Sequence, residues 1–190
     1  MASVVGVLAS WNTRDNTFAP TGGRLVDLTL MTYRTWVGSG YGFNRFRLDA
    51  RQYISIGRKR SLAFQFLGEI TNGDVPFHLL PFVGGQNLLR GYLKKRYRDK
   101  VAALVQAKYR ADLFWRIGWV AFAGVGDVTS SVGNFGMGEP KISVGAGSRF
   151  KPTDDGVRLR LDFGAGRDGG GMYLTVLGAF FRRDHGGQTG

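Results

Sequence analysis

The chain has 190 residues and a mass of 20.9 kDa, which is long enough for one domain with a sizeable core. Hydrophobic residues make up 43% of it, too many for a disordered chain, and the lack of cysteine excludes disulfide frameworks and zinc ribbons. The formal net charge of +12 indicates an anionic partner or surrounding, either nucleic acid or lipid headgroups.

Apolar and polar residues alternate in nine segments, and successive side chains of a strand point to opposite faces. Residues 43–56 show the pattern best, with Phe46 and Leu48 on one face and Arg45 and Arg47 on the other. No helical period competes with the alternation, so the predicted fold class is all-β. In chain order the predicted strands are 3–12, 24–36, 43–56, 61–70, 101–113, 116–127, 141–150, 157–163 and 172–181.

Alternation alone permits two architectures. In a soluble sheet the apolar face forms the core, whereas in a membrane barrel it meets lipid and the charged face lines the interior. Tryptophans and tyrosines lie mostly toward segment ends, which favours the barrel, and no apolar run is long enough for a spanning helix. In the barrel the predicted lumen-facing residues are Arg45, Arg47, Asp49, Arg51, Lys108, Arg110, Arg158 and Arg160.

A long connection separates the fourth and fifth segments, and such loops usually have a function. It contains Gly84 and Gly85, followed by Arg90, Gly91 and Tyr92. This motif resembles the signature of the BamA/TamA-type outer-membrane protein superfamily, also called the bacterial surface antigen family. Further similarities lie on both sides of the motif, in the order that the family has. Before it are residues 12–16 with Pro20-Thr21-Gly22, and after it are residues 97–99, 108–110, 122–126, 145–150 and 160–162.

The resemblance implies an antiparallel transmembrane β-barrel in the bacterial outer membrane, here spanning residues 1–181 with a disordered tail at 182–190. It also implies that the motif loop folds into the lumen. A guanidinium buried there requires a carboxylate. We expect Arg90 to contact Asp162, with Asp127 as the second candidate, because Lys108 and Gly124 stand where the family usually has acids. The last strand, with Leu174, Val176 and Phe180, corresponds to the family's insertion signal.

Strand number raises the question of closure. The family barrel has sixteen strands, with five after the motif loop, whereas this chain has four before the loop and five after it. We therefore expect the C-terminal half of such a barrel, without POTRA domains. Because open edges are unstable in lipid, closure requires an eight-stranded barrel without the first segment, a second copy, a complex subunit or a missing barrel half.

No catalytic, metal-binding or cofactor-binding constellation is found, since His78 and His185 fall in the loop and the tail. The glycine runs are expected to relieve crowding inside strands. The resemblance implies a non-enzymatic role in outer-membrane protein insertion or secretion, with outer-membrane lipid, lipopolysaccharide and other protein chains as partners and without nucleic acid. Two alternatives remain, namely a structural, scaffold or pore barrel, and a soluble basic β protein that binds nucleic acid.

Overall fold

A single antiparallel sheet of nine strands dominates the computed structural model, which describes residues 3–17, 19–34, 40–114, 116–136, 138–150 and 158–177. The side chains of residues 114, 158 and 177 are outside this description. The strands pair in the order β1-β2-β3-β4-β7-β8-β9-β10-β11. Their bounds are Val5–Asn12, Gly23–Tyr33, Phe43–Ser55, Arg60–Gly73, Val101–Phe114, Ile117–Thr129, Lys141–Phe150, Arg158–Gly166 and Gly169–Leu177.

The prediction of an all-β, antiparallel architecture is confirmed, because each of the nine predicted segments overlaps one of these strands. The loop adds a second sheet that alternation did not predict. It consists of β5 (Phe82–Val83) and β6 (Tyr97–Arg98), which pair antiparallel. Two short 3₁₀ helices, η2 (Phe77–Leu79) and η3 (Val132–Asn134), complete the described elements. Among the described residues, no helix has the length and apolar character needed to cross a membrane.

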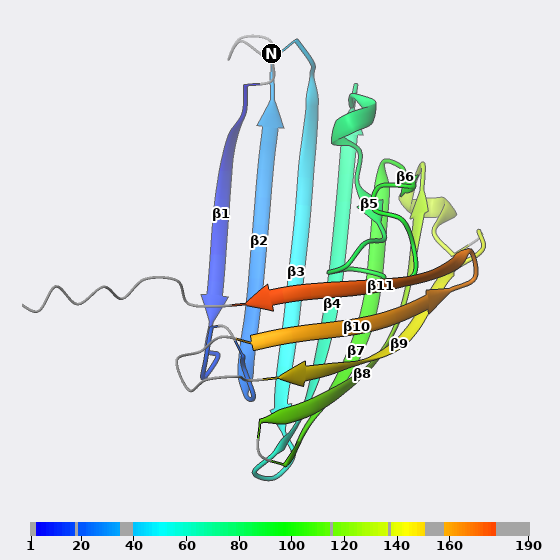
Figure 1. The fold of residues 1–190 in the computed structure, drawn as a ribbon. Coiled ribbons are helices and arrows are strands. Elements are labelled where there is room, and N and C mark those ends of the chain that lie inside the picture. The colour runs from blue at the N-terminus through cyan, green and yellow to red at the C-terminus, as the bar shows by residue number, and fades with distance from the viewer. Residues whose placement is uncertain are drawn as a thin grey trace, which may run out of the picture.

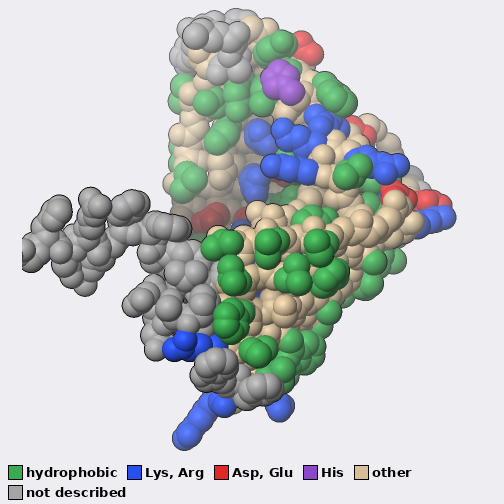
Figure 2. All heavy atoms as spheres, in the orientation of Figure 1, with side chains coloured by type: hydrophobic (Ala, Val, Ile, Leu, Met, Phe, Trp, Pro, Cys, Tyr) green, Lys and Arg blue, Asp and Glu red, His purple; other side chains and the backbone are tan. Residues whose placement is uncertain are grey.

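The sheet is strongly curved, so that β9–β11 lie in front of the earlier strands and the motif loop sits between them (Figure 1). Apolar side chains cover the outward face of β9–β11 (Figure 2). Val144, Phe163 and Leu174 belong to this face, and each is more than half exposed. Such an exposed apolar surface fits contact with lipid, in which apolar side chains need no water-excluding partner.

The buried apolar core lies on the concave face, between the loop and the wall. It joins Val83, Leu89 and Tyr92 of the loop to Leu67 of β4 and Leu104 of β7. The core therefore fixes the loop against the inner side of the sheet and leaves the outer side free for lipid.

Within the part of the chain that the structure describes, both sheet edges are open, since β1 and β11 each have one neighbouring strand. The described residues do not form the eight-stranded closed barrel that was one predicted alternative. The first segment does not drop out, because β1 pairs with β2 along its whole length, from Val5 opposite Thr32 to Asn12 opposite Leu25. The chain thus forms part of a barrel wall.

Candidate functional site

The loop between β4 and β7 makes a tight reversal around the motif. Gly84, Gly85 and Gly91 have φ angles of +108°, +98° and +95°, which side-chain-bearing residues rarely adopt. The Gly85 amide donates a hydrogen bond to the Tyr92 carbonyl at 3.0 Å. These turns, together with the β5–β6 pair, direct the Arg90-Gly91-Tyr92 tip at the inner face of β8–β11.

Arg90 is the largest fully buried side chain among the described residues, with 1% exposure. Its Nε lies 3.2 Å from Asp162 Oδ2, and its guanidinium stacks 4.2 Å above the centre of the Phe122 ring. Its backbone carbonyl accepts a hydrogen bond from the Ser143 hydroxyl. Arg90 is therefore held by an ion pair, by a cation–π contact and by a hydrogen bond to its backbone carbonyl.

One carboxylate serves two arginines in this cluster. Asp162 is completely buried and also accepts a 2.6 Å hydrogen bond from Arg160 Nε. Burial and the adjacent positive charge of Arg160 lower the pKa of Arg90 to about 10, although Asp162 acts in the opposite direction. Arg90 therefore remains charged at neutral pH, and its burial depends on Asp162.

Tyr92 and Gly91 extend the attachment to β9, to the turn between β10 and β11, and to β11. The Tyr92 hydroxyl donates to the Ile142 carbonyl at 2.9 Å and accepts from the Arg167 amide at 3.1 Å. The Gly91 amide donates to the Tyr173 hydroxyl at 3.1 Å. The tip thus bridges three neighbouring strands and would resist their separation.

Glycines of the wall create the space that the tip occupies, a feature that sequence reasoning attributed only to relief of crowding. A Cβ atom at Gly164 would lie 2.5 Å from Arg90 Cβ, and one at Gly166 would lie 2.4 Å from the Tyr92 ring. At Gly126 it would lie 2.9 Å from Leu89. The signal was available, because these glycines fall at every second position of the strands and therefore share one face.

Asp127, the second predicted partner of Arg90, pairs instead with Lys141, whose Nζ lies 3.0 Å from its Oδ1. The reason is strand parity. Phe122, which contacts Arg90, faces inward, whereas Asp127 is five residues further along β8, on the face of Val125 and about 17 Å away at the usual rise per residue. Lys141 also lies 5.2 Å from the Tyr97 ring, so Asp127 supports the loop only indirectly.

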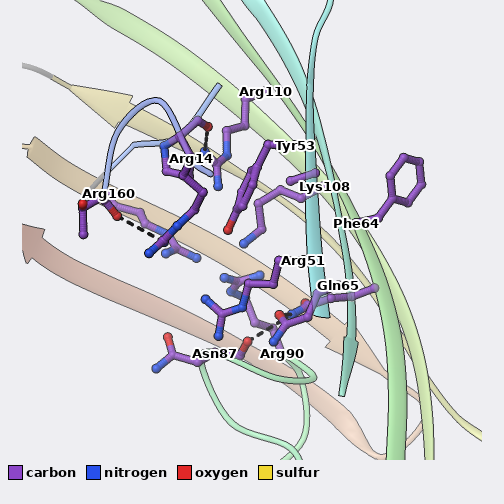
Figure 3. Close-up of a pocket in the computed structure, with 14 residues that line it drawn as sticks. Arg14, Arg51, Tyr53, Phe64, Gln65, Asn87, Arg90, Lys108, Arg110 and Arg160 are labelled. Atoms are coloured by element: carbon purple, nitrogen blue, oxygen red, sulfur yellow. Dashed lines mark hydrogen bonds between the residues drawn. The ribbon is translucent and has the colours of Figure 1, made fainter. Parts of the chain in front are cut away.

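The other predicted lumen-facing residues lie on the concave face in two groups. In the first, Arg45 and Arg47 both contact Glu69, and Arg51 is bonded to Asp49 at 2.7 Å. In the second, Lys108, Arg110 and Arg160 line a cavity that they share with Arg14, Arg51 and Arg90 (Figure 3). The side chain of Arg158 lies outside the described residues.

In the last strand, Leu174 and Val176 point outward and are exposed. Phe180, the third residue of the predicted insertion signal, lies outside the described residues, as does the predicted tail at 182–190.

Comparison with known proteins agrees with this architecture. A family model described as the Omp85 superfamily domain matches residues 2–168, whereas no curated protein matches the sequence. The fold is similar to the crystal structure of BamA from Haemophilus ducreyi lacking POTRA domains 1–3, with a TM-score of 0.75 at 13% sequence identity. The match covers 92% of this chain and 42% of that chain, so the chain spans less than half the length of the BamA structure.

The family match extends over most of the chain and includes the motif loop and eight of the nine strands of the large sheet. It confirms the family resemblance, and with it the placement in the bacterial outer membrane and in a non-enzymatic family. The chain belongs to the Omp85 superfamily of outer-membrane β-barrel proteins.

Proposed function

We propose that this chain forms the loop-bearing wall of a barrel that inserts or translocates other proteins at the outer membrane. The observation that carries the proposal is the attachment of the Arg90-Gly91-Tyr92 tip to the inner face. The tip reaches three strands through Asp162, Ser143, Ile142 and Tyr173. A loop anchored in this way braces the wall beside the open edge at β11, where further strands can pair.

The open edges support the same role. Strand β1 is exposed at all eight of its residues, and its outer hydrogen-bonding groups have no neighbouring strand among the described residues. Unpaired backbone groups in hydrocarbon cost several kcal/mol each. The wall therefore favours pairing with additional strands, which is the interaction that insertion of a β-strand client requires.

A structural or scaffold barrel is the second candidate function. It is favoured by Lys108 and Gly124, which stand where the family resemblance implies acids. Leu89 packs on Gly124, so the space that an acidic side chain would occupy is filled by the loop. In this role the anchored loop would act only as a rigid plug.

We further propose outer-membrane lipid and lipopolysaccharide as the surroundings of the wall. The apolar outward face supports contact with lipid tails. Basic residues gather at the loop (Figure 2), and Lys94, Lys95 and Arg96 are exposed there, which suits anionic lipopolysaccharide groups.

Gene deletion with complementation tests the assembly role. The fraction of outer-membrane barrels that are folded is measured by their heat-modifiable migration on gels. We expect deletion and Arg90→Ala to reduce this fraction, and the exposed-arginine control Arg58→Ala to restore it fully. An unchanged profile of folded barrels in the deletion strain would favour the scaffold barrel.

A further inference from the structure

We propose that the concave face carries a binding site for a phosphate-type oxyanion, formed by the cavity beside the motif loop. This site goes beyond the proposed assembly role and does not depend on it. The cavity has a volume of about 390 Å³. A water molecule takes about 30 Å³ in the liquid, so the cavity has room for a polyatomic anion with part of its hydration shell.

The charge of the cavity wall is the first argument. Among the fourteen described residues that line it, none is acidic and six are cationic, namely Arg14, Arg51, Arg90, Lys108, Arg110 and Arg160. The charged ends of all but Arg110 point into one space (Figure 3). They come from separate elements: Arg14 from the turn after β1, Arg51 from β3, Lys108 from β7, Arg160 from β10 and Arg90 from the loop. Like charges this close repel one another, and an anion between them would remove the repulsion.

Neighbouring acids offset only part of this charge. Asp49 binds Arg51, and Asp162 is shared by Arg90 and Arg160. Arg14 donates at 2.9 Å to the neutral amide oxygen of Asn12. Asp49 and Asp162 thus pair with Arg51, Arg90 and Arg160, and the described lining of the cavity itself contributes no acidic side chain, so the site suits an anion with more than one charge.

An unused donor is the second, independent argument. Arg90 is 1% exposed, and its Nη1 has no hydrogen-bond partner among the described residues. A buried guanidinium donor left without an acceptor is costly, and native structures usually satisfy it. Arg90 lines the cavity, and although its Nη1 is itself buried, a small shift of the guanidinium would let an oxyanion there supply the acceptor.

The type of donor selects the anion. Guanidinium groups present two parallel N–H donors that match the oxygens of phosphate, and an ammonium such as that of Lys108 adds a point charge. The amides of Gln65, Asn87 and Gln106 also line the cavity and can donate to further oxygens. A halide ion would use few of these donors, so we expect phosphate and pyrophosphate to bind more tightly than chloride.

The test uses the full chain folded in detergent micelles at low salt. Isothermal titration calorimetry measures binding of inorganic phosphate, pyrophosphate and chloride. We expect Lys108→Gln to weaken pyrophosphate binding about tenfold, the loss expected for one charge-assisted contact. The control Arg47→Gln removes a concave-face arginine that bonds Glu69 outside the cavity, and should change affinity less than about twofold.

Folding of each variant is checked by heat-modifiable migration, and Arg14→Gln, in a turn, replaces Lys108→Gln if the latter does not fold. Micelles doped with phosphatidic acid distinguish a lipid headgroup from free phosphate, and binding in either arm that depends on Lys108 or Arg14 supports the site. Absence of binding in both arms would overturn it. Cavity variants that bind pyrophosphate as tightly as the unchanged chain would also overturn it. Binding of polyglutamate without binding of any phosphate probe would overturn it too, because it would indicate an acidic polypeptide as the occupant.

Discussion

A single buried carboxylate, Asp162, compensates two arginines of different elements, Arg90 of the loop and Arg160 of β10. We predict that Asp162→Asn lowers the free energy of unfolding by about 3–5 kcal/mol, because it leaves two desolvated guanidinium groups facing each other. Urea unfolding in micelles, followed by tryptophan fluorescence, measures this change.

Asp49→Asn is the matched control, since it removes a concave-face carboxylate that also binds an arginine. The Arg51 side chain is 35% exposed, whereas that of Arg90 is 1% exposed. Solvent screening should limit the loss at Asp49 to about 1 kcal/mol. Equal losses in the two variants would contradict the special role of Asp162.

A second residue-scale prediction concerns the turn between β1 and β2. The Thr21 hydroxyl bonds the Asp15 carboxylate, and the Thr21 amide donates to it at 2.9 Å. The hydroxyl contact is the main reason why the pKa of Asp15 is lowered from 3.8 to about 2. A lowered acid pKa stabilises the turn above pH 3.8, and this contribution disappears as the pH falls through about 2.

Thr21→Val should therefore raise the pKa of Asp15 toward its ordinary value, as measured by NMR titration of the carboxyl carbon. Thr17→Val in the same turn serves as the control and should leave the titration midpoint unchanged. A midpoint near pH 2 in Thr21→Val would show that the backbone amides alone hold the carboxylate.

The residue scale also shows what sequence reasoning could reach. The family resemblance places Arg90 in the lumen, and charge balance then predicts Asp162 as its neighbour, because few acids alternate onto the arginine-rich face. Charge balance alone also permits Asp127, but Asp127 has the opposite strand parity to Phe122, which contacts Arg90, and it pairs with Lys141. The sharing of Asp162 with Arg160 depends on the packing of the loop against β10, which alternation within single strands does not describe.

At the scale of elements, the loop and the wall are fitted through glycines. We predict that Gly164→Ala lowers stability by about 1–3 kcal/mol and releases the tip, because the new Cβ would lie 2.5 Å from Arg90 Cβ. Gly170→Ala is the matched control, since its Cβ would meet nothing closer than 3.5 Å. Limited proteolysis of the loop, together with urea unfolding, distinguishes the two variants. Equal protection of the loop would argue against the glycine fit.

All nine wall strands could be predicted from the sequence. Each strand faces lipid on one side and the polar lumen on the other, so its apolar and polar residues alternate. The elements of the loop could not be predicted. β5 and β6 have two residues each, too few for a period, and Val83 is buried by the tertiary fold rather than by its own strand. Several predicted strand boundaries fall short where glycine begins or ends a strand, as at Gly73 and Gly169.

At the scale of the whole molecule, strand parity limits how the wall can close. All eight neighbouring pairs in the large sheet are antiparallel, so β1 and β11 run in the same direction. Two copies related by an axis along the membrane normal would therefore meet through parallel seams, which are slightly less stable per residue. An odd number of additional strands restores antiparallel pairing at both edges. Seven would give the sixteen strands that the family resemblance implies.

We therefore predict that a segment with an odd number of strands, rather than a second copy, completes the wall. The sequence contains no cysteine, so Val7→Cys in β1 and Leu174→Cys in β11 introduce the only thiols. Both side chains are exposed, and in a barrel of two copies the strands that carry them would be neighbours at each seam. Under oxidation we expect the double variant to give no more covalent dimer than either single variant. A band at twice 20.9 kDa that only the double variant forms would show that two copies share the barrel, and that parallel seams are tolerated in this wall.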